Sequence, residues 1–262
     1  MKKLFFGALL CAFVPFSHAQ DAAQPVNSVL QLFSCSLNPG QNADDVWSLL
    51  EAVRDQAMSQ GDAQGADLGI FLWTPFRGAT DYDYIWGATS PDLVTTMQGL
   101  ANYASSGGAE ALGPRFQALN ERCHSMIAMS EQTKVSSTPF NPANANDRVP
   151  DGLVETFSCN VRPGSTMADI RSATSFWQDQ MKKVASENLA KYAGYLVTPY
   201  RGGTGEADFG WIGTYPDMVS FGRGETDFMN SKEGQAANAR FEKVSTCRSA
   251  LWTGYWVKAP GA

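Results

Sequence analysis

Apolar and polar residues follow a pattern along this chain that occurs twice. In 46–57, apolar side chains recur at i, i+3, i+4, i+7 and i+11, which is the spacing of a helix lying on a core. A second stripe of this kind spans 170–184. A short apolar run that ends in a Pro-Gly pair precedes each stripe, over 29–37 and 153–161, and predicts a strand.

Each helical stripe is followed by two further strand-like runs, joined by a hairpin rich in glycine. These runs are 68–74 and 82–88 in the first half, and 192–198 and 208–214 in the second. The triplet Ser90-Pro91-Asp92 then predicts a helix start with Ser90 as N-cap, and Tyr215-Pro216-Asp217 occupies the same place later. After a glycine-rich break at 105–108, a second helical segment and a last strand close the unit, at about 114–122 and 123–129 in the first half. The order βαββαβ predicts a ferredoxin-like α+β fold.

The two halves also match residue by residue. Phe33-Ser34-Cys35 returns as Phe157-Ser158-Cys159, 124 positions later, and the offset becomes 125 after one inserted residue, as at Trp86 and Trp211. A period of this length corresponds to a whole domain. We therefore divide the chain into a leader (1–19), a first repeat (20–130), a linker (131–150) and a second repeat (151–262).

The first nineteen residues have the character of a secretory signal peptide. Lys2 and Lys3 precede an apolar run, and Ser17-His18-Ala19 supplies a small-x-small cleavage site. We therefore expect a periplasmic or secreted protein without a membrane span. Removal of the leader leaves 18 basic and 26 acidic residues. This acidic balance disfavours nucleic acid as a partner.

Four cysteines remain after the leader, and their spacing is the same in both repeats. Cys35 and Cys123 are 88 residues apart, as are Cys159 and Cys247. One pair per repeat in an exported protein predicts the disulfides Cys35–Cys123 and Cys159–Cys247. A thiolate metal site is disfavoured because His124 is the one histidine outside the leader. We expect no metal and no cofactor.

Two ferredoxin-like units of this length, each with a split second helix, resemble the dimeric α+β barrel superfamily over roughly residues 28 to 258. That superfamily includes antibiotic-biosynthesis-type monooxygenases, NIPSNAP-like and EthD-like proteins and the haem-binding chlorite dismutase group. The resemblance implies that two sheets face each other as a barrel, here within one monomeric pseudo-dimer. It also implies a helical histidine in haem-binding members, whereas His124 lies at a strand start beside a cysteine.

Several polar and aromatic residues recur in both copies and are the candidate site residues. The candidate ligand-binding residues are Thr74, Arg77, Trp86, Thr198, Arg201 and Trp211, and the candidate general bases are Asp83 and Asp208. Arg77 and Asp83 flank the hairpin, so they either grip an anionic or hydroxylated ligand or form a structural ion pair. The two tryptophans either pack the core or contact a flat apolar ligand.

Three functions follow from these features. The first is an exported protein that binds a small aromatic or apolar molecule, and the second is a cofactor-independent monooxygenase or isomerase. The third is a structural or interaction module without a ligand. A dry apolar cavity favours the first, a roomy cavity with a buried Asp83 or Asp208 favours the second, and a barrel without a cavity favours the third.

Overall fold

The computed structural model describes residues 28–59, 68–78, 81–134, 136, 148–202, 205 and 207–260. The expected leader and most of the expected linker lie outside this part of the chain. Of the linker range, 131–134 continue the last strand of the first repeat. Arg148 lies against the first repeat, where its guanidinium contacts Glu51 at 3.0 Å.

Each repeat has the expected order of elements, with one short helix added in the second. The first repeat contains β1 (Ser28–Leu37), α1 (Ala43–Met58), β2 (Gly69–Gly78), β3 (Tyr84–Ser90), α3 (Leu93–Ser105), α4 (Gly108–Leu119) and β4 (Asn120–Lys134). The second repeat contains β5 (Gly152–Val161), α5 (Met167–Met181), α6 (Glu187–Ala190), β6 (Ala193–Gly202), β7 (Phe209–Tyr215), α7 (Met218–Asn230), α8 (Lys232–Val244) and β8 (Ser245–Lys258).

Local sequence signals explain where the helices begin. Asn42 caps α1 in a capping box with Asp45, because its side chain satisfies an amide that has no partner within the helix. The expected N-cap Ser90 is wrong: Ser90 ends β3, and Asp92 caps α3 by accepting a hydrogen bond from the Thr95 amide. A carboxylate at this position satisfies the amide and also complements the helix dipole.

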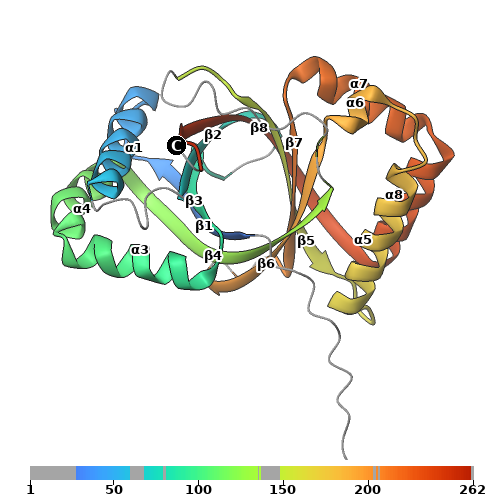
Figure 1. Cartoon of the computed structure of the whole chain (residues 1–262), viewed down its shortest axis with the longest axis horizontal. Helices are drawn as coiled ribbons and strands as arrows, with labels where there is room; N and C mark the ends of the chain where they lie inside the picture. The colour runs from blue at the N-terminus through green and yellow to red at the C-terminus, as the bar shows by residue number, and fades with distance from the viewer. Residues whose placement is uncertain are drawn as a thin grey trace, which may run out of the picture.

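The eight strands form one closed antiparallel barrel in the order β1-β3-β2-β8-β5-β7-β6-β4 (Figure 1). Within each repeat the order is that of a ferredoxin-like sheet, and β2–β8 and β4–β6 join the two repeats. Residue pairs such as Thr74 with Thr253 and Thr198 with Met129 mark these seams. Closure leaves neither sheet with a free edge.

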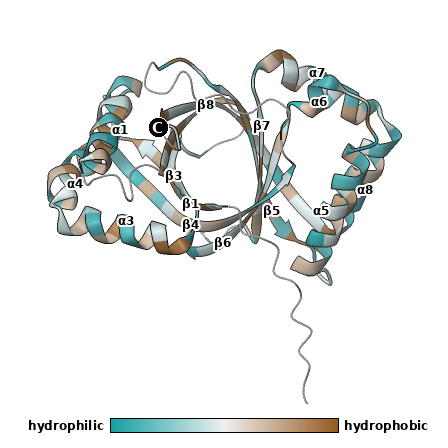
Figure 2. Ribbon diagram, in the orientation of Figure 1, coloured by the Kyte–Doolittle hydropathy of each residue, from teal (hydrophilic) through white to brown (hydrophobic). Residues whose placement is uncertain are grey.

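The helices cover the outer surface of the barrel on opposite flanks, α1, α3 and α4 on one side and α5 to α8 on the other (Figures 1 and 2). Because side chains alternate along a strand, each sheet has an outer face under its helices and an inner face toward the barrel axis. Three apolar cores result: one under the helices of each repeat and one inside the barrel. The inner core includes Leu32, Trp73 and Trp252.

Both expected disulfides are confirmed. Cys35 is bonded to Cys123, and Cys159 to Cys247. Each pair joins directly opposed positions of the first and last strands of its repeat.

Candidate functional site

The two candidate general bases support the backbone instead of lining a cavity. Asp83 is exposed, and its carboxylate accepts a hydrogen bond from the Leu37 amide at 2.7 Å. Asp208 is exposed too and accepts one from the Val161 amide at 2.8 Å. Each aspartate therefore ties the start of the third strand of its repeat to the end of the first.

The candidate arginines and threonines do not gather at a cavity. Arg77 and Arg201 are exposed at the ends of β2 and β6, and Arg201 lies over the ring of its neighbour Tyr200 at 5.1 Å. Within the part of the chain that the structure describes, Arg77 forms no ion pair with Asp83. Thr74 and Thr198 lie in the strand seams between the repeats and do not line the cavities described below.

Trp86, by contrast, lines a cavity between the helices and the sheet of the first repeat. This first-repeat pocket has a volume of about 420 Å³. Its walls are mostly apolar and come from β1, β2, β3, α1, α3 and α4; they include Phe33, Val53, Ala57, Ile70, Leu100, Tyr103, Leu112 and Phe116. Such a cavity suits a small ligand with a large apolar surface.

The Trp86 indole packs against two phenylalanine rings but has an unused donor. Its ring stacks on Phe33 with centroids 4.2 Å apart, and Phe116 lies 5.8 Å away. Trp86 Nε1 is buried and has no hydrogen-bond partner in the described structure. A buried N–H without an acceptor is unfavourable.

Trp211, the counterpart of Trp86, lines a second helix–sheet cavity of about 450 Å³, the second-repeat pocket. Here the indole donor is used, because Trp211 Nε1 donates to the Tyr192 hydroxyl at 2.6 Å. Burial and, to a smaller extent, the nearby Glu225 carboxylate together raise the pKa of Glu155 in this pocket to about 8. The pKa of Glu225 is also raised, chiefly by burial. The two pockets thus share a position but differ in chemistry.

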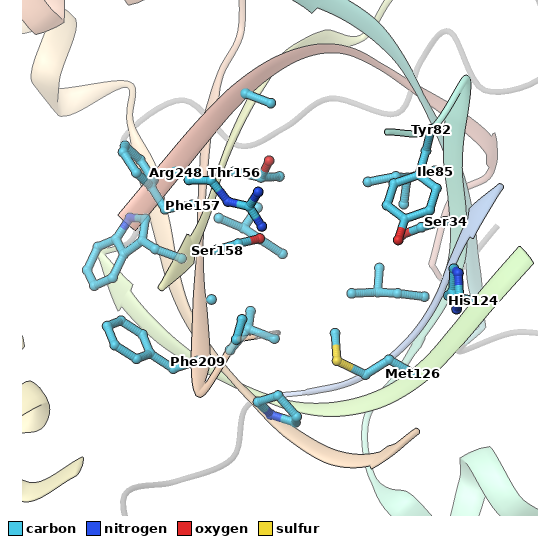
Figure 3. A pocket seen from close by; sticks show the side chains of 18 of the residues that line it. Ser34, Tyr82, Ile85, His124, Met126, Thr156, Phe157, Ser158, Phe209 and Arg248 are labelled. Carbon is cyan, nitrogen blue, oxygen red and sulfur yellow. The ribbon is translucent and has the colours of Figure 1, made fainter. Parts of the chain in front are cut away.

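A third cavity, of about 280 Å³, lies inside the barrel. Figure 3 shows Arg248 and Ser158 on one side of it and Tyr82, Ser34 and His124 on the other. The repeat offset relates His124 to Arg248 and Ser34 to Ser158, so each copy supplies equivalent positions to this cavity. His124 contacts the Tyr82 ring, with centroids 5.9 Å apart.

In the described residues, no three His, Cys, Asp or Glu side chains are grouped as a metal site would require. Of the helices that the structure describes, none combines the length and the apolar character needed to cross a bilayer.

The sequence analysis missed the most unusual residues, Glu155 and Glu225. A signal was available, because the repeat offsets place Glu155 opposite Gln31 and Glu225 opposite Leu100. The candidate residues named from the sequence all recur in both copies, whereas these two acids do not.

Several solved structures have a similar fold at low sequence identity. A protein from Fusobacterium nucleatum described as a candidate monooxygenase superposes with a TM-score of 0.58 at 14% identity, over 90% of this chain and 96% of its own. An anthrone oxidase-like protein gives 0.52 at 9% identity, over 90% of this chain and 96% of its own. A candidate monooxygenase from Lactobacillus acidophilus gives 0.52 at 7%, over 89% and 98%.

This chain has the dimeric α+β barrel fold. The expected superfamily resemblance is thereby confirmed at the level of architecture, with both halves of the barrel in one chain. No protein-family profile and no curated protein matches the sequence. At these identities the likeness establishes the fold and leaves function to the residues of this chain.

Proposed function

We propose that this protein binds a small, flat, largely apolar molecule in the first-repeat pocket. The observation that carries the proposal is the buried Trp86 Nε1 without a partner in the described structure, at a mostly apolar cavity of about 420 Å³. A bound carbonyl or ether oxygen would accept this hydrogen bond, while the walls bury the ligand's apolar surface.

The monooxygenase or isomerase alternative relied on an Asp or Tyr acting with the aromatic pocket, and the bases assigned to it by number were Asp83 and Asp208. Both are exposed and bonded to backbone amides, so this alternative lacks the base assigned to it. The structural-module alternative relied on a barrel and sheets without a cavity, whereas cavities are present under both sheets and inside the barrel. The binding function is therefore the better supported of the three.

We also propose that the protein is exported and acts as a monomer. Two disulfides fit an oxidising compartment, since such bonds rarely persist in the cytosol. A barrel closed within one chain supports the monomer, because both strand seams are already filled. Light scattering on the exported protein checks the mass in solution, and mass spectrometry of its N-terminus checks cleavage after Ala19.

The binding proposal is tested with two probes of nearly equal shape, 2-acetylnaphthalene and 2-isopropenylnaphthalene. Only the first carries an oxygen that can accept from Trp86 Nε1. We expect it to bind more tightly to the wild type, and we expect Trp86→Phe to remove most of that advantage, about a tenfold effect for one hydrogen bond. Binding is measured by isothermal titration calorimetry.

Trp211→Phe is the matched control, because it makes the same change in the other repeat. Ala57→Met introduces the residue found at the equivalent position of the second repeat, Met181, and we expect it to weaken both probes by filling the pocket. The proposal fails if neither probe binds, or if Trp86→Phe weakens the two probes equally.

A further inference from the structure

The second-repeat pocket is an aromatic-walled cavity whose chemistry is not explained by duplication. Its rings form a contiguous set: Trp177 lies 4.9 Å from Trp211 and 5.8 Å from Tyr192, and Tyr192 lies 5.0 Å from Tyr215, as measured between centroids. The faces of such rings carry partial negative charge and attract cations.

Carboxyl groups enter this cavity from three elements. Glu155 comes from β5, Glu225 from α7 and Glu242 from the exposed rim on α8. At the matching positions the first-repeat pocket has Gln31, Leu100 and Gln117. The acids are therefore specific to the second copy. Half-buried carboxyls lower the stability of a fold unless they are paired, so we look for a function of these acids in this pocket.

Neither Glu155 nor Glu225 is paired with a basic side chain in the described structure. Among the residues that the structure describes, no Lys or Arg forms an ion pair with Glu155 or Glu225. Glu225 accepts a hydrogen bond from the Tyr215 hydroxyl at 3.1 Å. The titratable groups whose charges act on this cluster are the two acids and Tyr192, Tyr195 and Tyr215, which carry no positive charge.

We propose that the second-repeat pocket binds a small organic cation, an amine carried on an aromatic or apolar body. The rings surround the body and the charged group, and Glu155 with Glu225 supplies the counter-charge. A bound ammonium favours the ionised carboxylate. Because the pKa of Glu155 is raised to about 8 in the folded protein, we expect binding near pH 7 also to release a proton.

The test compares three naphthalene probes that differ in charge: 2-naphthylmethylammonium, neutral 2-naphthylmethanol and anionic 2-naphthoate. We expect the cation to bind at least tenfold more tightly than the neutral probe, and the anion to bind more weakly than both. Calorimetry at pH 7 in two buffers with different ionisation enthalpies measures the proton balance. We expect between a half and one proton to be released per cation bound.

The variants Glu155→Gln and Glu225→Leu introduce the residues of the first repeat, and we expect both to fold because neither replacement has to be kept ionised in a partly buried site. Each should lose most of the preference for the cation, and Glu155→Gln should also abolish proton release. Glu242→Gln is the matched control at the rim; it changes the net charge equally and should alter cation affinity less than threefold. Equal binding of cation and neutral probe, or equal losses in Glu242→Gln and Glu155→Gln, overturns the proposal.

Discussion

The carboxylate of Asp83 accepts a hydrogen bond from the backbone amide of Leu37 across 2.7 Å. The Asp83 amide in turn donates to the Cys35 carbonyl at 2.9 Å. Asp208 repeats both contacts with Val161 and Cys159. The recurrence of this aspartate is thus explained by the way each hairpin is attached to the first strand of its repeat.

The first prediction concerns this attachment. We expect Asp83→Ala to lower the free energy of unfolding by about 1–2 kcal/mol, because the Leu37 amide loses a charged acceptor. The measurement is urea unfolding followed by tryptophan fluorescence. Asp81→Ala is the control, because Asp81 accepts hydrogen bonds through its backbone carbonyl, which the substitution keeps. The free energy of unfolding of this variant should be close to that of the wild type. If Asp83→Ala strongly weakened probe binding, Asp83 would have a role in ligand binding and the purely structural assignment would be wrong.

The second prediction compares the two buried tryptophans. Trp211→Phe leaves the buried Tyr192 hydroxyl without its donor at 2.6 Å, so we expect a destabilisation about 1 kcal/mol greater than that of Trp86→Phe. Both changes remove similar ring area, which makes each the control for the other. Thermal and urea unfolding of the two ligand-free variants measures the difference, and a larger effect at Trp86 would contradict the hydrogen-bond assignment.

The third prediction concerns the pH dependence of stability. Burial, with a smaller effect of the Glu225 carboxylate, raises the pKa of Glu155 to about 8 from its usual 4.5, so between these pH values the folded protein holds a proton that the unfolded chain has released. Stability from this group is therefore present at low pH and is lost as the pH rises from about 4.5 to 8, with a limiting slope of about 1.4 kcal/mol per pH unit.

Glu155→Gln should remove this slope and stabilise the protein at pH 8 relative to the wild type. Urea unfolding at a series of pH values from 5 to 8 measures the effect. Wild type and Glu155→Gln with parallel pH profiles would show that Glu155 titrates normally in the folded protein.

The fourth prediction concerns the disulfides. Each closes a loop of 88 residues between the first and last strands of a repeat. Replacing both cysteines of a pair with serine should lower the free energy of unfolding by about 2–5 kcal/mol, because the unfolded chain regains conformational freedom. Calorimetric melting of the two double variants and of the reduced wild type checks this, and an unchanged melt under reductant would contradict it.

The architecture was predictable because the same sequence pattern occurs in both halves of the chain. The offset between Cys35 and Cys159, together with the equal spacing to Cys123 and Cys247, defines the repeat and the strand pairs that the disulfides join. Strand and helix order followed from periodicity. The N-cap at Asp92 was misplaced because both Ser90 and Asp92 suit that position, and only the path of β3 decides between them.

The candidate site was less predictable, for a reason visible in particular residues. Arg77 and Arg201 recur, yet both are exposed near the ends of β2 and β6 and line none of the cavities described above. Trp86 and Trp211 recur and do line cavities, but whether their indole donors are paired depends on Tyr192, which has Leu68 as its counterpart in the first repeat. Residues that recur in both copies include those with a structural role in the fold. The residues that differ between the copies are those that give the two pockets different chemistry.

The seams between β2 and β8 and between β4 and β6 have an evolutionary consequence. In a barrel assembled from two identical subunits, every substitution alters both pockets at once, so a change that suits one ligand is imposed on the other site. In this chain each repeat is encoded separately, so a substitution alters one pocket only. The other repeat continues to supply the strands that complete the barrel. Gln31 and Glu155 hold equivalent positions in one barrel with different side chains, which a symmetric homodimer cannot achieve.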